Sequence, residues 1–285
     1  MPKNTDELVS LLDLEEIEQG LYRGEQPQTL LQQTFGGQVL AQSLVAAHRT
    51  VGEDRLIHSL HAYFLRPGSK EHSMIYDVQT LRDGRGFSSR HTLARQEGTT
   101  KFAMNSSFHV NEPGLEHSDA MPPDLPAPED CPTMAEMFGQ NTGMGRLMHE
   151  WDALDVRFAG DSGRSKAIEA RSHGAHMRVW VKTSSKLPED QVLHRAVLAY
   201  LSDLTLLSVS MVPHDEIDFL SAQMQVASID HAMWFHRDVR ADEWMLYDQV
   251  SPSASNSLGF SSGRIMQDGK LVATCSQEGL IRIVD

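Results

Sequence analysis

The chain has 285 residues, and 25 lysines and arginines stand against 39 aspartates and glutamates, which gives a formal net charge of −14. Its 40% hydrophobic and 22% charged residues are typical of a globular protein with a substantial core and exclude a chain that is disordered throughout. The acidic balance argues against a general nucleic-acid binder and against a surface that binds anionic lipid. We therefore expect no nucleic-acid partner and no membrane association.

The number and spacing of the cysteines indicate in which kind of compartment the protein resides. Cys131 and Cys275 are the only two, and neither lies in a CxxC pair, so no disulfide framework is expected. The N-terminus lacks the apolar segment of a signal peptide, and the uncharged stretches are too short or too polar for a membrane span. Together these features predict a reducing, cytoplasmic location.

The first part of the chain changes from helical to strand patterns. Apolar spacing predicts a short amphipathic helix over residues 6–17, and Gly36-Gly37 predicts a turn before a buried helix at residues 38–47. Turn signals then separate segments that alternate as an antiparallel meander does. The four predicted strands cover residues 57–65, 73–81, 87–96 and 101–110.

The same order of elements returns after a proline-rich, acidic segment that cannot support a long helix. We predict an N-terminal repeat at residues 1–112, a linker at 113–150 and a C-terminal repeat at 151–285. The C-terminal repeat has one long apolar helix, predicted at residues 196–212. Its predicted strands cover residues 176–183, 224–235, 244–251, 259–267 and 271–283.

Short matches between the two halves indicate a duplication. Gly86-Phe87-Ser88-Ser89 matches Gly259-Phe260-Ser261-Ser262, and Tyr76-Asp77 matches Tyr247-Asp248, in the same order and at nearly constant separation. A helix that is apolar on every side must be buried. The sequence therefore predicts an α+β fold in which each repeat wraps a curled antiparallel sheet around one long central helix.

Asp203 is the only charged residue in the apolar run from Ala196 to Val212. A buried carboxylate needs hydrogen-bond donors or a raised pKa, and a carboxylate in an apolar cleft can act as a general base. The alternative is an Asp on a solvent-facing side of the helix, although its neighbours at helical spacing are apolar.

Two further polar residues stand out in predicted strands. Alternation places Gln277 on the apolar face of the last strand, where its amide needs partners, either nearby backbone or a functional site. Ser228 shares a strand face with Val226 and Trp234, and a serine there is ordinarily structural. His231 and His236 fall on opposite strand faces, which argues against a shared metal.

Several long motifs, in order along nearly the whole chain, resemble the acyl-CoA thioesterase II family, the double-hotdog thioesterases. They are Phe35-Gly-Gly-Gln-Val, His58-Ser-Leu-His-Ala-Tyr-Phe-Leu-Arg-Pro-Gly68, Tyr76-Asp-Val-Gln-Thr-Leu-Arg-Asp-Gly84, Tyr200-Leu-Ser-Asp-Leu, Ile229-Asp-His-Ala-Met-Trp-Phe-His-Arg237 and Ser276-Gln-Glu-Gly279. The resemblance implies a tandem (double) hotdog fold.

The resemblance also implies a site in which an Asp, a Thr or Ser, and a Gln hold a water molecule. These roles fall on Asp203, Ser228 and Gln277, and Ser228 departs from members that carry Thr there. All three lie in the C-terminal repeat, whereas Ser107 stands at the Gln277 position of the first repeat. A backbone N–H near a helix N-terminus is implied as the donor to the thioester oxygen, and the Gly36-Gly37 turn is a candidate.

The expected activity is hydrolysis of fatty acyl-CoA thioesters to free acid and CoA by Asp-activated water, without a covalent acyl-enzyme and without a cofactor. A non-catalytic acyl-CoA binder and a hotdog acyl-CoA hydratase are the alternatives. The resemblance further implies a homodimer or homotetramer, because such sheets leave edges that pairing covers.

Overall fold

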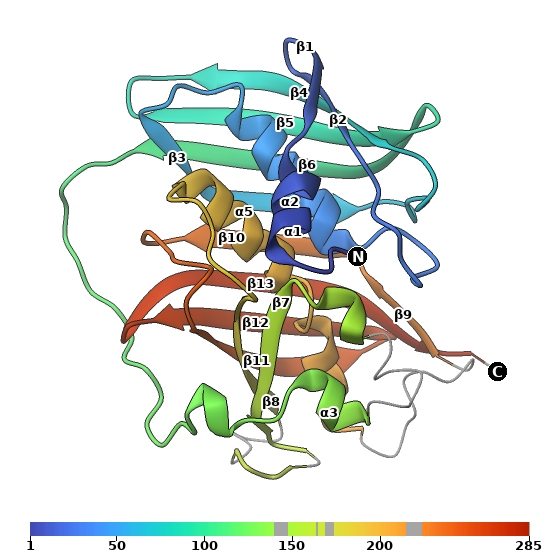
Figure 1. Cartoon of the computed structure of the whole chain (residues 1–285), viewed down its shortest axis with the longest axis vertical. Coiled ribbons are helices and arrows are strands. Elements are labelled where there is room, and N and C mark those ends of the chain that lie inside the picture. The colour runs from blue at the N-terminus through green and yellow to red at the C-terminus, as the bar shows by residue number, and fades with distance from the viewer. Residues whose placement is uncertain (140–147, 164, 169–173, 215–223, 285) are drawn as a thin grey trace.

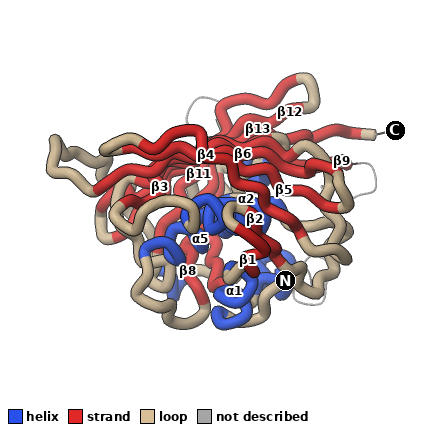
Figure 2. The backbone as a smooth tube through the Cα atoms, turned by 90° about the horizontal axis from the view of Figure 1, so that it is seen from above, coloured by secondary structure: helices blue, strands red, loops and turns tan. Residues whose placement is uncertain are grey.

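The computed structural model describes residues 1–139, 148–163, 165–168, 174–214 and 224–284. One large antiparallel sheet forms its frame, with the strand order β1-β2-β4-β5-β6-β3-β10-β13-β12-β11-β8-β7 and β9 paired to β13. The long helices α2 and α5 lie together on one side of this curved sheet (Figure 2). The sheet therefore wraps two central helices, as the duplication predicts.

The N-terminal half contributes the upper part of the sheet in Figure 1. Its elements are α1 (Thr5–Leu12), β1 (Glu15–Glu18), β2 (Leu21–Gly24), α2 (Gly36–His48), β3 (Arg55–Phe64), β4 (Met74–Asp83), β5 (Phe87–Gln96) and β6 (Thr99–Val110). Helix α2 is buried from Gly37 to Ala47, because most of these residues are apolar or small and the buried Gln42 amide bonds to the Leu11 oxygen and the Tyr76 hydroxyl.

The C-terminal half repeats the arrangement. Its elements are β7 (Leu154–Asp161), β8 (Ala175–Thr183), α5 (Gln191–Ser202), β9 (Met224–Ser228), β10 (Asp230–Phe235), β11 (Met245–Ser255), β12 (Leu258–Gln267) and β13 (Lys270–Ile283). Strands β3 and β10 join the two halves, with Met233 opposite Leu60 in an antiparallel register. The central strands of the two repeats thus form one continuous sheet.

The proline-rich segment crosses the outer side of the C-terminal sheet. The indole N–H of Trp180 donates to the backbone oxygen of Pro126 at 3.0 Å, and Met121 and Leu125 pack against a cluster that includes Trp180 and Leu246. Short helices follow this segment: 3₁₀ turns at Pro128–Asp130 and His149–Trp151, and α3 (Met134–Phe138). The predicted boundaries at residues 112/113 and 150/151 stay predictions.

Four predictions about local structure were wrong. The helix predicted over residues 6–17 ends at Leu12, and Glu15–Glu18 forms β1. Gly36 and Gly37 do not form a turn before the helix; they are the first residues of α2, and Phe35 is its N-cap. The strand predicted over residues 224–235 is interrupted at Ile229, because β9 pairs with β13 alone while β10 pairs with both β13 and β3. The helix predicted to reach residue 212 ends at Ser202.

Further strands were missed by the sequence patterns. Strands β1 and β2 are only four residues each, and β1 is exposed along its whole length, so neither shows a clear alternation. Strand β7 follows the proline-rich segment and was likewise not predicted. These elements lie at the two ends of the sheet.

The stretch Gln191–Met211 comprises α5 and the 3₁₀ helix that follows it. By length and composition it is long and apolar enough to cross a membrane, which was not predicted from the sequence. Within the structure, 72% of its apolar window is buried. A core helix of a soluble protein meets the same criterion, and this stretch packs against α2 at the centre of the molecule.

Candidate active site

Asp203 occupies the C-cap of α5 rather than the interior of a longer helix. Helix α5 ends at Ser202, whose Oγ donates to the Ala199 oxygen at 2.8 Å. The chain then continues as a 3₁₀ helix at Leu207–Met211. This change of direction turns the Asp203 carboxylate toward the N-terminus of α2 while leaving it only 9% exposed.

Ser228 reaches Asp203 because the chain bends at Ile229. The Ile229 N–H donates to the Glu278 oxygen, and the Ile229 oxygen accepts from the Phe64 N–H at 2.9 Å, which fixes the bend between β9 and β10. Ser228, the last residue of β9, then donates its hydroxyl to Asp203 Oδ1 at 3.1 Å. The interruption that the sequence pattern did not predict is what positions this side chain.

Gln277 lies on the face of β13 that the alternation predicted, and it is fully buried. Its Nε2 donates to Asp203 Oδ1 at 2.5 Å. Its Oε1 has no hydrogen-bond partner within the described part of the chain. A buried carbonyl oxygen beside a carboxylate is therefore free to accept a hydrogen bond from a small molecule such as water.

The N-terminus of α2 closes the site from the other repeat. The Gly37 backbone N–H donates to the Asp203 carboxylate, and a Cβ on Gly36 would lie 2.6 Å from Asp203 Oδ2. A Cβ on Gly37 would lie 2.3 Å from the Tyr200 backbone oxygen. Both glycines are needed for α2 and the end of α5 to approach this closely, and the positive end of the α2 dipole faces the carboxylate.

Burial controls the protonation of Asp203. The surrounding apolar groups raise its pKa to about 6, although the hydrogen bonds from Gln277, Ser228 and the Gly37 N–H act in the opposite direction. A carboxylate with a pKa near 6 is ionised at pH 7 and is a stronger base than an ordinary Asp.

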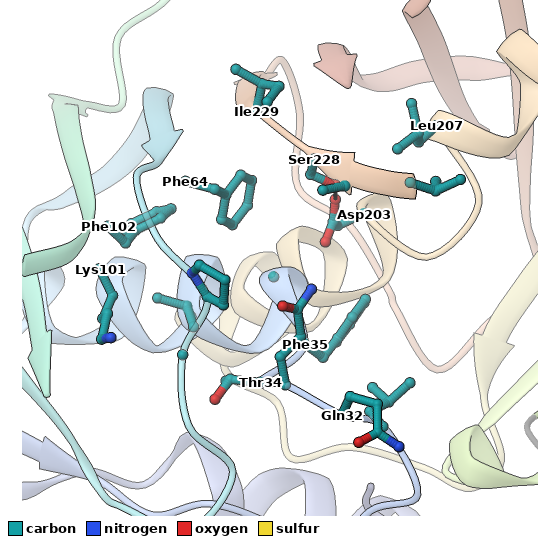
Figure 3. A pocket seen from close by; sticks show the side chains of 18 of the residues that line it. Gln32, Thr34, Phe35, Phe64, Lys101, Phe102, Asp203, Leu207, Ser228 and Ile229 are labelled. Carbon is teal, nitrogen blue, oxygen red and sulfur yellow. Dashed lines mark hydrogen bonds between the residues drawn. The ribbon is translucent and has the colours of Figure 1, made fainter. Parts of the chain in front are cut away.

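A cavity of about 560 Å³ opens beside Asp203 between the two repeats. Its walls are mainly apolar, and Figure 3 shows Phe35, Phe64 and Phe102 from the N-terminal half facing Leu207 and Ile229 from the C-terminal half. Ser228 and Asp203 lie at its wall. The cavity thus offers a site for an apolar ligand next to a base.

The corresponding position of the N-terminal repeat has different chemistry. Ser107, which stands where Gln277 stands in the other repeat, hydrogen-bonds to His58 Nε2 at 2.8 Å. Helix α2 ends at His48, and its C-cap is Arg49 rather than an acid. The structure brings all three predicted site residues together at one site only, between the end of α5 and the start of α2.

Sequence reasoning did not identify one buried group beside the end of α5. His231 on β10 is fully buried and bonds through Nε2 to Ser202 Oγ at 3.0 Å, and burial lowers its pKa to about 4, so it is neutral at pH 7. The Gly36-Gly37 backbone, the candidate donor to the thioester oxygen, lies beside Asp203, where the Gly37 N–H lowers the pKa of the carboxyl group. Among the described residues, no group of three or more His, Cys, Asp or Glu side chains could hold a metal ion.

Comparison with known proteins assigns the chain to a family. A sequence profile described as "Acyl-CoA thioesterase" covers residues 153–280, and one described as "Acyl-CoA thioesterase N-terminal domain" covers residues 26–109. The chain is 39% identical to acyl-CoA thioesterase 2 of Haemophilus influenzae, over 96% of each chain. The chain belongs to the acyl-CoA thioesterase family.

Other acyl-CoA thioesterases agree with this assignment. Human acyl-coenzyme A thioesterase 8 is 34% identical over 97% of this chain and 89% of its own length. The crystal structure of acyl-CoA thioesterase II TesB2 from Mycobacterium marinum superimposes with a TM-score of 0.83 at 41% identity, covering 96% of this chain and 97% of that one. The double-hotdog architecture and the thioester hydrolase class that the sequence predicted are confirmed.

Proposed function

We propose that this thioesterase hydrolyses fatty acyl-CoA thioesters by direct attack of water that Asp203 deprotonates. The single observation that carries the proposal is the buried carboxylate at the cavity wall, bonded to Ser228 and Gln277 with the Gln277 oxygen left free. Water between Asp203 and Gln277 Oε1 would donate one hydrogen to each acceptor, which orients its oxygen toward the cavity.

The charge that develops on the thioester oxygen needs a donor. The first backbone N–H groups of α2 have no partners within the helix, and they face the cavity at Gly36. We assign the oxyanion to this turn, while the Gly37 N–H stays with Asp203. The proposed reaction uses water as nucleophile and Asp203 as base, so it needs neither a cofactor nor a covalent acyl-enzyme.

The apolar walls favour an acyl chain as the group that fills the cavity. The two alternatives predict other behaviour: an acyl-CoA binder would leave the thioester intact, and a hydratase would add water to an unsaturated acyl chain without releasing thiol. The cytoplasmic location and the homodimer or homotetramer remain predictions.

The test is thiol release from a series of saturated acyl-CoAs of increasing chain length, followed by intact-mass measurement of acid-quenched enzyme during turnover. We expect release of CoA and unmodified protein mass. Accumulation of protein heavier by one acyl group would contradict direct water attack. Binding of acyl-CoA without thiol release at any chain length would contradict the proposed hydrolysis.

A further inference from the structure

Side chains of opposite charge lie at different places along the cavity beside Asp203. Among the described residues that line it, Asp203 is the one acidic side chain, and Arg66 and Lys101 are the two basic ones. Figure 3 shows the side chains of Lys101 and Asp203 on opposite sides of the drawn cavity. The carboxylate is almost fully buried, whereas Arg66 is exposed and Lys101 is partly exposed. The basic end of the cavity is therefore open to solvent.

The backbone holds the two basic residues together. The N–H groups of Leu65 and Arg66 both donate to the Lys101 backbone oxygen, at 2.8 and 3.1 Å. Arg66 Nη1 donates to the neighbouring Thr100 oxygen at 3.1 Å. The two side chains thus project from adjacent, hydrogen-bonded segments, and their spacing does not depend on a free loop.

The loop that follows Arg66 is also anchored. The buried amide of Gln96 accepts from the Ser69 N–H at 2.7 Å and donates to the Ser69 and His72 oxygens. On the other side, the Thr34 N–H donates to the Gly68 oxygen at 2.9 Å. The rim of the cavity is therefore a fixed structure in which Arg66 has a defined position.

The charges of Arg66 and Lys101 are not compensated by carboxylates. Other arginines of this acidic chain are paired, for example Arg90 with Asp83 and Arg95 with Asp77. Within the described ranges, neither Arg66 nor Lys101 forms such an ion pair. Two unpaired cations at the mouth of a cavity, in a chain of net charge −14, form a local site for an anion.

We propose that Arg66 and Lys101 bind the phosphates of CoA at the mouth of the cavity. The proposal rests on the proposed function, because it takes acyl-CoA as the substrate. In acyl-CoA the pantetheine arm separates the thioester from the phosphates, so phosphates bound at the basic rim leave the thioester to reach inward to Asp203. Arginine suits bidentate contact with phosphate, and lysine adds a point charge.

The test compares two thioesters with the same acyl group, one on CoA and one on pantetheine, which has no phosphates. We expect Arg66→Glu and Lys101→Glu each to raise KM for acyl-CoA roughly tenfold to a hundredfold with little change in kcat, because each loses a charge-assisted contact. Hydrolysis of the acyl-pantetheine should change less than twofold. Lys270→Glu is the matched control, because Lys270 is an exposed cation at the start of β13 and does not line the cavity.

Direct binding separates failure of this proposal from failure of the proposed function. Calorimetric titration of CoA should show weaker binding to both rim variants than to the wild type, and a loss of wild-type affinity as salt concentration rises. That result would support the phosphate site even if no acyl-CoA were hydrolysed. Unchanged CoA affinity in both variants, or an equal loss with acyl-CoA and acyl-pantetheine, would overturn it.

Discussion

The amide nitrogen of Gln277 lies 2.5 Å from Oδ1 of Asp203, although 74 residues separate them in the chain. The same oxygen accepts the Ser228 hydroxyl at 3.1 Å. One carboxylate oxygen is thus held by the end of β9 and the middle of β13, while the start of α2 supplies a further N–H. The site exists only because both repeats share one sheet and the end of α5 meets the start of α2.

The pH dependence of hydrolysis follows from the pKa of Asp203. Because the base acts when it is ionised and its pKa is raised to about 6, kcat/KM should fall about tenfold for each pH unit below 6. Gln277→Ala removes a donor that lowers this pKa. The acid limb of the variant should therefore move to higher pH, with a lower plateau because the water loses its second acceptor.

These two profiles can be measured as initial rates of thiol release between pH 4 and 9, after confirming that both proteins stay folded. A wild-type profile that stays flat down to pH 4.5 would rule out an ionised Asp203 of this pKa as the base. An acid limb at the same pH in Gln277→Ala as in the wild type would show that the Gln277 amide does not affect the pKa of Asp203.

Ser228 offers a comparison between a hydroxyl kept and a hydroxyl lost. Ser228→Ala deletes the donor to Asp203 Oδ1 and should lower kcat about tenfold, the equivalent of one hydrogen bond to a charged group. Ser228→Thr keeps the hydroxyl and should retain most of the activity. If steady-state kinetics gave equal losses for Ala and Thr, the effect would come from packing rather than from the hydrogen bond.

Gly36 tests the close approach of the two helices. A Cβ there would lie 2.6 Å from Asp203 Oδ2 and 2.9 Å from the Phe64 ring, so Gly36→Ala should displace the carboxylate and lower kcat at least tenfold, in the range of effects seen when a catalytic group is misplaced. Gly114→Ala is the control, because a Cβ at Gly114 meets nothing within 4 Å. Activity of Gly36→Ala equal to that of Gly114→Ala would contradict the described geometry.

Much of the site could be predicted from the sequence. Asp203 stood out because no other charge occurs in its apolar run, and Gln277 because alternation placed an amide on a buried face; both are buried as expected. Strand β5 has the predicted bounds, since turns mark both of its ends. The association of all three side chains rested on the family resemblance, and the structure brings them into contact.

Other features depend on tertiary contacts that no local pattern carries. The apolar pattern of α5 continues past Ser202, yet the α-helix ends there and a 3₁₀ helix follows. The bend at Ile229 is set by the pairing of two strands with different partners. Arg66 and Lys101 lie 35 positions apart in the sequence and come together through backbone hydrogen bonds between their two segments. No sequence pattern marks them as a pair.

The buried carboxylate should also lower stability at neutral pH. Its pKa is higher in the folded state than the ordinary 3.8, so the folded protein holds the proton more tightly, and the free energy of unfolding falls as pH rises from about 4 to about 6. Above pH 6 the full cost is present, on the order of 3 kcal/mol. Asp203→Asn should therefore unfold at a higher temperature than the wild type at pH 8, and at a similar one at pH 4. A lower melting temperature at pH 8 would indicate that the ionised carboxylate stabilises the fold.

The most direct measurement is kcat for acyl-CoA hydrolysis by wild type and Asp203→Asn at pH 8, with acyl-CoA binding and melting temperature measured on the same samples. The loss of a general base predicts a fall in kcat of about a hundredfold to ten-thousandfold, with binding retained and the protein folded. Hydrolysis by folded Asp203→Asn at the wild-type rate would contradict the role of Asp203 as the base that activates water.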